Sequence, residues 1–97
     1  MNLNEVTAEI RESAKSAKIS GKTVKLALDI GVVYLDLRKS PAVVSNDDHP
    51  ADATVTTSLA TLENLSNKKT NPMMAIISGK VKIEGDVAAA MQLQSIL

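Results

Sequence analysis

The residues best suited to chemistry lie in one short polar stretch, which places four oxygen or nitrogen ligands within six residues: Asp47, Asp48, His49 and Asp52. A metal site requires such ligands to converge in a fixed geometry, with further hydrogen bonds that orient them. The same residue types also favour a solvated turn. Because turn propensity explains the stretch without a metal, we interpret it as a loop and expect neither a metal nor a cofactor.

The sequence also lacks a complete motif for nucleotide binding and a complete set of residues for nucleophilic catalysis. Residues 16–23 (Ser-Ala-Lys-Ile-Ser-Gly-Lys-Thr) nearly match a phosphate-binding loop, but that motif needs Gly at the position of Ser16 and a strand before it. Nucleophilic catalysis would have one His, no Cys and no Gly-x-Ser-x-Gly turn to use. The carboxylates of Asp29 and Asp36 are expected on the solvated face of a sheet. We therefore expect that the protein is not an enzyme.

Composition excludes a second class of function. The 97 residues include eleven basic and eleven acidic side chains and a single aromatic residue, whereas nucleic-acid binding relies on clustered positive charge or on aromatic stacking. The longest strongly apolar stretches, residues 73–77 and 87–91, are far shorter than the roughly 20 residues of a membrane span. The sequence contains no Cys, and because no basic start followed by an apolar run appears at its beginning, we expect no signal peptide. We expect one cytoplasmic domain over residues 1–97 that binds no nucleic acid.

The first half of the chain predicts one helix followed by strands. Leu3, Val6, Ile10, Ala14 and Ala17 share a helical face, so a helix is expected over residues 3–18, with a capping box formed by Asn2 and Glu5. The period then changes to two, which predicts strands over residues 24–30 and 33–38 around a turn at Gly31, and shorter strands over residues 42–45 and 53–57. We expect these four strands to form an antiparallel meander.

The second half predicts mainly helices. Ser58 is a candidate cap for a helix that contains Leu59, Leu62 and Leu65. Asn71 and Pro72 open a short helix that ends at Gly79. The interior of this helix, residues 73–77, has no polar side and is expected to be buried all round. A strand over residues 80–84 and a last helix capped by Asp86 complete the order α-β-β-β-β-α-α-β-α. The helices carry more apolar surface than one sheet face needs, which suggests a pocket.

Three stretches of the second half form a recognisable pattern: DATVTTSLATLENL (52–65), NPMMAIISGKVKIEGD (71–86) and AAAMQLQSIL (88–97). Through them, residues 52–97 resemble the sterol carrier protein 2 family. The resemblance implies an α/β (α+β) fold with a five-stranded, mainly antiparallel sheet, helices over one face and a hydrophobic tunnel between them. It also implies loosely selective binding of fatty acids, acyl-CoA, sterols or phospholipids. Gln92 departs from the family, many members of which have Lys there.

From this resemblance and the apolar pattern, we predict that the chain sequesters one long-chain lipid, and that it can transfer it. The predicted tunnel wall on the sheet consists of Val24, Leu26, Leu28, Leu35 and Leu37. The predicted roof consists of Leu59, Leu62, Met73, Ile76 and Ile77. Val87, Met91 and Leu97 are expected to form a lid, and Gln94 a polar contact near the head group.

Two other functions remain open from the sequence. The chain could be an accessory protein that presents a prenylated, quinone-type intermediate to biosynthetic enzymes, or a lipid-free interaction module with a filled core. The expected partners are a long-chain lipid, lipid-metabolising enzymes and, at most, a transient membrane contact. The identity of the lipid, the direction of transfer and the oligomeric state are not predicted.

Overall fold

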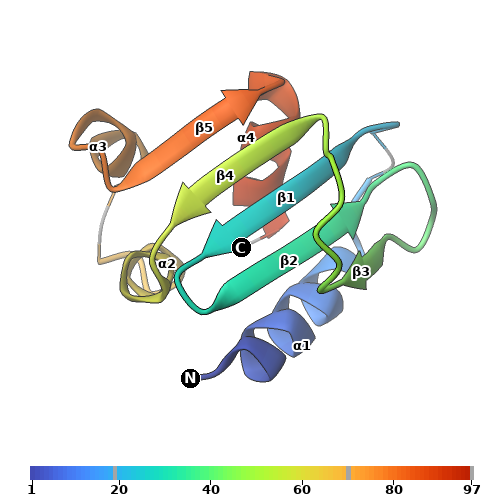
Figure 1. Cartoon of the computed structure of the whole chain (residues 1–97), viewed down its shortest axis with the longest axis horizontal. Coiled ribbons are helices and arrows are strands. Elements are labelled where there is room, and N and C mark those ends of the chain that lie inside the picture. The colour runs from blue at the N-terminus through green and yellow to red at the C-terminus, as the bar shows by residue number, and fades with distance from the viewer. Residues whose placement is uncertain (19, 70, 97) are drawn as a thin grey trace.

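A computed structural model describes residues 1–18, 20–69 and 71–96; the side chains of Pro72, Gln94 and Ser95 also lie outside the described set. Its elements follow the expected order (Figure 1): α1 (Leu3–Ala14), β1 (Thr23–Leu28), β2 (Gly31–Asp36), β3 (Val43–Ser45), β4 (Ala53–Thr57), α2 (Leu59–Ser66), α3 (Pro72–Ile77), β5 (Val81–Gly85) and α4 (Val87–Ile96). The predicted fold class, a mainly antiparallel five-stranded sheet with helices over one face, is confirmed.

The strand order in the sheet is β3-β2-β1-β4-β5. Three of the pairings are antiparallel, but β4 pairs in parallel with β1, with Val24 opposite Ala53. The predicted meander of four strands is therefore wrong. Residues 46–52 instead carry the chain over the open face of the sheet, from β3 at one edge to the far side of β1 (Figure 1). Seven extended residues span about 23 Å, which exceeds the width of three strand spacings at about 4.8 Å each.

The predicted helix caps are confirmed. Asn2 and Glu5 form a capping box, in which each side chain accepts a hydrogen bond from the other's backbone N–H. The Ser58 hydroxyl accepts from the N–H of Thr61, and the Asn71 side chain accepts from the N–H of Met73. In addition, the Asp86 carboxylate accepts from the N–H of Ala89 at 3.2 Å. Each cap satisfies a backbone donor that the first helical turn leaves unpaired.

The largest boundary differences from the prediction concern α1 and the hairpin of β1 and β2. Helix α1 ends at Ala14 rather than near residue 18, because the N–H groups of Ser20 and Gly21 both bond to the carbonyl of Leu37 and draw the chain onto the end of β2. The turn between β1 and β2 lies at Asp29 and Ile30, before Gly31 rather than at it.

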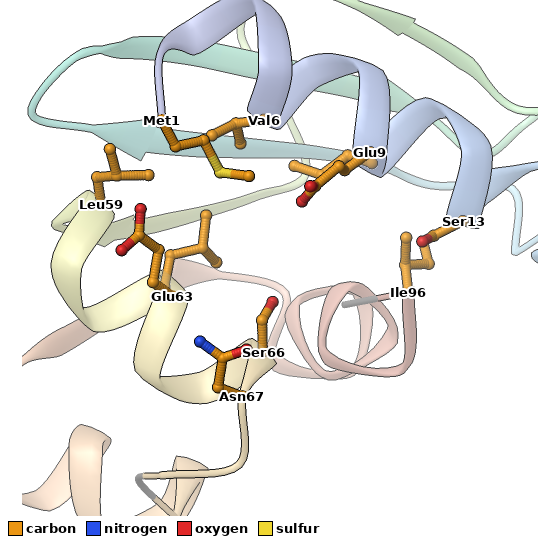
Figure 2. Close-up of a pocket in the computed structure, with 11 residues that line it drawn as sticks. Met1, Val6, Glu9, Ser13, Leu59, Glu63, Ser66, Asn67 and Ile96 are labelled. Atoms are coloured by element: carbon orange, nitrogen blue, oxygen red, sulfur yellow. The ribbon is translucent and has the colours of Figure 1, made fainter.

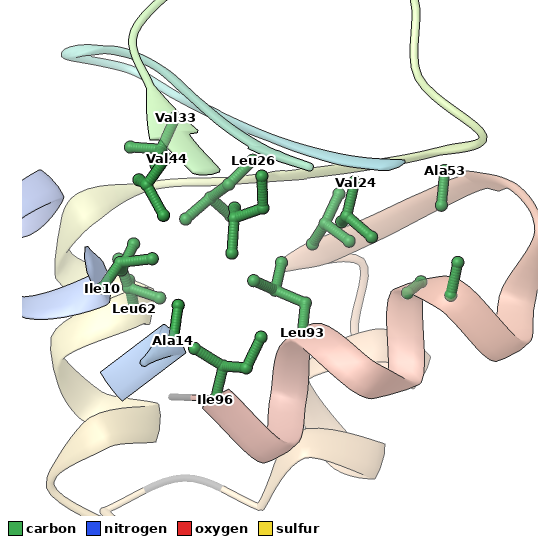
Figure 3. Close-up of a cluster of buried hydrophobic side chains, with 14 of the residues drawn as sticks. Ile10, Ala14, Val24, Leu26, Val33, Val44, Ala53, Leu62, Leu93 and Ile96 are labelled. Atoms are coloured by element: carbon green, nitrogen blue, oxygen red, sulfur yellow. The ribbon is translucent and has the colours of Figure 1, made fainter. Parts of the chain in front are cut away.

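The core lies between one face of the sheet and the helices α1, α2 and α4 (Figure 3). From the sheet, Val24, Leu26, Val33 and Leu35 are almost completely buried, as is Leu37 directly after β2. They pack against Ile10 of α1, Leu62 of α2, and Leu93 and Ile96 of α4. The small residues Ala89 and Ala90 are also buried, which lets α4 approach the sheet closely.

Helix α3 corrects a second expectation. Its apolar residues were predicted to be buried all round, but Met73, Met74 and Ile77 are 59%, 59% and 72% exposed, whereas Ala75 is buried and Ile76 half-buried. The reason is its position at the outer edge of the sheet, where it packs against the edge strand β5 (Figure 1). Among the described side chains of α3, those of Ala75 and Ile76 therefore pack against the domain, and those of Met73, Met74 and Ile77 face outward.

The position of Asp36 also differs from the prediction. Its side chain was expected on the solvated face of the sheet, but the residue is only 6% exposed. Arg38 surrounds its carboxylate: the Nε and Nη2 atoms donate to the two oxygens at 2.9 and 2.8 Å, and the backbone N–H donates to Oδ1 at 3.0 Å. These bonds to Arg38 lower the pKa of Asp36 from 3.8 to about 2.

Asp52 joins three parts of the fold at one corner of the sheet. Its carboxylate accepts hydrogen bonds from the N–H and the hydroxyl of Thr23 at 2.8 and 3.2 Å, and its N–H donates to the Thr23 hydroxyl. The backbone N–H of Thr23 is the main cause of a lowered pKa of Asp52. The carbonyl of Asp52 accepts from the N–H of Asp86 at 2.9 Å. β1, β4 and the start of α4 are thereby fixed to one another.

Gly85 lies so close to this corner that a side chain cannot fit. A Cβ atom there would clash with the backbone carbonyl oxygen of Asp52, and Gly85 has a φ of +86°. We expect Gly85→Ala to lower the free energy of unfolding by at least about 3 kcal/mol, because the backbone clash adds to the cost of the left-handed conformation. Gly79 is a matched control with a φ of +79° and open space around it, so Gly79→Ala should cost only about 1–2 kcal/mol. Urea denaturation measures both, and equal losses would contradict the steric argument.

The lowered pKa of Asp36 predicts a pH-dependent contribution to stability. Because the folded state favours the ionised form, the stabilisation is fully present above about pH 4 and is lost as the pH falls through about 2. We expect Asp36→Asn to destabilise the protein by about 1–2 kcal/mol at neutral pH, less than the shift alone implies because Arg38 is half exposed. In denaturation experiments this difference should shrink between pH 4 and 2. Glu84→Gln, at an exposed ion pair, should change stability little at either pH, and a constant difference for Asp36→Asn would contradict the assignment.

Candidate functional site

A cavity of about 300 Å³ opens between α1, α2 and the C-terminal end of α4 (Figure 2). Its apolar lining consists of Met1, Val6, Ile10, Leu59, Leu62 and Ile96. Its polar lining consists of Glu9, Ser13, Glu63, Ser66 and Asn67. Val6, Ile10, Leu62 and Ile96 are buried, so the floor of the cavity is continuous with the core, while polar groups form the rim.

Helix α1 contributes one wall because Val6 and Ile10 lie one turn apart on its buried face. Two contacts hold this helix against the sheet. The Arg11 guanidinium donates to the carbonyl of Val44 at 3.2 Å, and the Asn46 amide donates to the Thr7 hydroxyl at 2.9 Å. The wall is therefore fixed to β3 and to the segment that follows it.

Helix α2 contributes the opposite wall. Asp29, in the turn between β1 and β2, accepts a hydrogen bond from the N–H of Leu59 at 3.0 Å and so holds the start of α2 to the sheet. Leu59 and Leu62 then face the cavity. At the other end of the helix, Lys68 has a φ of +59°, and its N–H bonds to the carbonyl of Leu65, which ends the helix next to the rim.

A second cavity of about 390 Å³ adjoins the first, since Ser13 and Ile96 line both. Its other lining residues are Ser16, Ala17, Lys18 and Gln92. The Gln92 amide donates to the carbonyl of Lys18 at 2.7 Å and joins α4 to the segment after α1. We call the two adjoining cavities the helix trough.

The charge around the helix trough is uneven. In the first cavity, Glu9 of α1 and Glu63 of α2 project into the space between the two helices (Figure 2). The described lining of this cavity contains these two carboxylates and no Lys or Arg side chain. Lys18 lines the second cavity. A ligand group at the first mouth therefore meets two carboxylates, and Met1, which carries the positively charged α-amino group, lines the same cavity.

The predicted lipid-binding residues occupy different places. The sheet residues Val24, Leu26, Leu35 and Leu37 lie beneath packed helices, and Leu28 is half-buried. Leu59 and Leu62 line the first cavity. Ile76 is half-buried, and Met73, Ile77, Val87 and Met91 are exposed. Leu97 and the side chain of Gln94 lie outside the described residues. The contact of these residues with a ligand, and the continuous tunnel, stay predictions.

Sequence reasoning missed most of the trough. The spacing of Val6 and Ile10 revealed an apolar helix face, but it was used only to predict the helix and not to place a cavity against it. Ile96, at the end of the last helix, was expected to lie with Leu97 at the mouth of a tunnel, and it lines both cavities. No sequence signal predicted that Glu9 and Glu63 line the same cavity, because this depends on how two helices distant in the sequence are placed.

Side chains of the polar stretch over residues 47–52 contact β1 and β2. Asp48 accepts a hydrogen bond from Lys25 at 2.8 Å, and the His49 ring contacts the Tyr34 ring edge to face at 5.3 Å. Asp52 faces Thr23. Among the residues that the structure describes, no three His, Asp or Glu side chains gather as metal ligands would. The described helices also include none with the length and hydropathy of a membrane span.

These features define a small α/β domain in which helices cover one face of a five-stranded sheet and enclose an apolar-floored trough. The chain belongs to the SCP-2 sterol transfer family, whose model matches residues 3–97. The resemblance found in the sequence is thus confirmed, and it extends over the N-terminal half.

Curated relatives match over part of the chain. Sterol carrier protein 2 of Bos taurus is 40% identical over 55 residues, which is 57% of this chain and 10% of that protein. Hydroxysteroid dehydrogenase-like protein 2 of Rattus norvegicus is 34% identical over 71 residues, which is 71% of this chain and 14% of that protein. The chain therefore spans only a small fraction of these relatives.

Solved structures share the fold over almost the whole chain. Sterol carrier protein 2 like 2 from Aedes aegypti has a TM-score of 0.77 at 18% identity and covers 98% of this chain and 95% of its own. A ubiquinone synthesis protein, UbiJ-SCP2, has a TM-score of 0.73 at 14% identity and covers 96% of this chain and 90% of its own. At these identities the similarity establishes the fold alone.

Proposed function

We propose that this domain binds one long-chain lipid, with the apolar chain of the ligand in the helix trough, and passes it between donor and acceptor surfaces. The observation that carries the proposal is the buried apolar floor of Val6, Ile10, Leu62 and Ile96 beneath an open cavity. Membership of the SCP-2 sterol transfer family supports it. The domain would act by burial alone, without a chemical step.

The energetics fit a carrier that must also release its ligand. Each methylene that leaves water contributes about 0.8 kcal/mol, and association costs about 4–15 kcal/mol. Small-molecule sites usually measure about 300–1,000 Å³, so the first cavity is at the lower end of that range. A long chain would therefore occupy both adjoining cavities and pass the side chains of Ser13 and Ile96, which line both.

The rim indicates which head group the site would accept. Glu9 and Glu63 would repel a fatty-acid carboxylate or the phosphates of acyl-CoA at the first mouth. An uncharged head, such as the hydroxyl of a sterol or a prenylated phenol, would meet no such repulsion and could donate a hydrogen bond to a carboxylate. Among the predicted ligands, we therefore favour neutral lipids.

The same observation supports a second candidate function, the presentation of a prenylated, quinone-type intermediate to biosynthetic enzymes. Such a ligand combines a long apolar chain with a neutral ring, which suits the acidic rim. A pull-down from cells distinguishes the two functions: stable recovery of lipid-modifying enzymes would favour presentation, and recovery of lipid alone would favour the carrier.

Filling the trough should abolish lipid binding. Ser13 lines both cavities, so the ring of Ser13→Phe would block their junction. Ala8, exposed on the same helix and absent from both linings, gives the matched control Ala8→Phe. With a pyrene-labelled long-chain alcohol as the fluorescent probe, we expect Ser13→Phe to weaken binding at least tenfold and Ala8→Phe to leave it unchanged. A parent protein that takes up no such lipid would refute the carrier function, and equal binding by both variants would exclude the trough as the site.

Removing the rim charge should change head-group preference. We expect Glu9→Gln/Glu63→Gln to strengthen palmitate binding about threefold to tenfold, since each exposed charge contributes up to about 1 kcal/mol. Binding of an uncharged alcohol of equal chain length should change less than twofold. Competition against the fluorescent probe measures both ligands. Equal effects on the acid and the alcohol would show that the carboxylates do not select the head group.

A further inference from the structure

We propose that α3 and the segment before it form a docking surface for anionic lipid bilayers. The proposal rests on the proposed function, because a lipid carrier must meet a membrane to load and release its ligand. The first observation is the exposed apolar surface on α3, where Met73, Met74 and Ile77 are each more than half exposed. Single exposed apolar residues are ordinary, but three on one six-residue helix form a local patch.

The second observation is the charge around this patch. The chain has no net charge, yet residues 64–83 contain four lysines and no Asp or Glu. The remainder of the chain carries seven basic and eleven acidic side chains. Lys68 and Lys69 precede α3 in the sequence and Lys80 follows it; all three are exposed, and none of them has an ion pair with another described residue. Lys82 pairs with Glu84 at 3.6 Å.

Exposed apolar side chains bordered by lysines fit an anionic bilayer surface. The methionines and Ile77 would enter the boundary between head groups and acyl chains, and the lysines would pair with lipid phosphates. A second copy of this chain would also cover the apolar residues, but it would bring the same uncompensated lysines against each other. The charge therefore favours the bilayer as the occupant.

The position of the surface suits this role. Ser66 and Asn67 line the first cavity, and Lys68 and Lys69 follow them directly. Their backbone N–H groups bond to the carbonyls of Leu65 and Asn64, which fixes the basic segment to the end of α2. Docking by α3 would therefore bring the end of the first mouth with Ser66 and Asn67 toward the bilayer, whereas Glu9 and Glu63 lie further along α1 and α2 (Figure 2).

The test measures binding of the full chain to sedimented vesicles. One set of vesicles contains phosphatidylglycerol and phosphatidylcholine in equal parts, and the other contains phosphatidylcholine alone. We expect the parent to bind the anionic vesicles at low salt, and to be released as salt screens the charges. Lys68→Gln/Lys69→Gln should weaken this binding by about fivefold for each lysine. The matched control Lys15→Gln/Lys39→Gln removes two exposed lysines elsewhere and should bind as the parent does.

The apolar half of the surface has its own pair of variants. Met74→Gln/Ile77→Gln should weaken binding to anionic vesicles by about tenfold, whereas Ile30→Gln/Val43→Gln, which changes two exposed apolar residues elsewhere, should not. Circular dichroism checks that each variant is folded. The proposal is overturned if the parent ignores anionic vesicles, if test and control variants bind alike, or if sedimentation shows a dimer that only Met74→Gln/Ile77→Gln dissociates.

Failure of the docking surface is separable from failure of the carrier function. Uptake of the pyrene-labelled alcohol from solution needs no vesicle. Lys68→Gln/Lys69→Gln should therefore take up that probe as the parent does while it loses vesicle binding. A parent protein that takes up the probe but does not bind vesicles would overturn the docking proposal and leave the carrier function standing. A parent protein that binds vesicles but takes up no probe would overturn the carrier function alone.

Discussion

The contact on which the arrangement of the other elements depends is the one that Asp52 makes with its neighbours. Its carboxylate holds the start of β1 through Thr23, and its carbonyl holds Asp86, the cap of α4. The parallel pairing of β1 with β4 and the direction in which α4 leaves the sheet are thus set at one point. The position of Ile96 at the far end of α4, and with it one side of the helix trough, follows from this corner.

Local signals in the sequence predicted the helices and strands, but they did not predict every pairing between strands. The caps at Asn2, Ser58, Asn71 and Asp86 are short-range hydrogen bonds, and each was predicted from residue type and spacing. The place of β4 beside β1 depends on a connection over the sheet, which periodicity does not encode. The resemblance in residues 52–97 supplied the family and the fold class, and the family model confirms it.

The trough was harder to predict, because a cavity is a property of spacing between elements. An apolar residue has the same pattern whether it fills a core, lines a hollow or faces solvent. Leu26 and Met73 both lie in apolar stretches, yet one is completely buried and the other mostly exposed. What separates them is the number of neighbouring layers: β1 lies at the centre of the sheet under the helices, whereas α3 lies beside its edge strand.

The path of residues 46–52 over the open face also bears on how the chain folds. The hairpin of β1 and β2 can form from residues adjacent in sequence, but β1 gains its second neighbour only when Ala53 reaches Val24. Such a closure costs chain entropy before the contacts repay it, which slows folding relative to a purely local topology. Until it occurs, one edge of β1 presents unpaired backbone groups that can bond to another chain. The step that gives β1 its second neighbour therefore also protects this strand of the newly made protein from pairing with another chain.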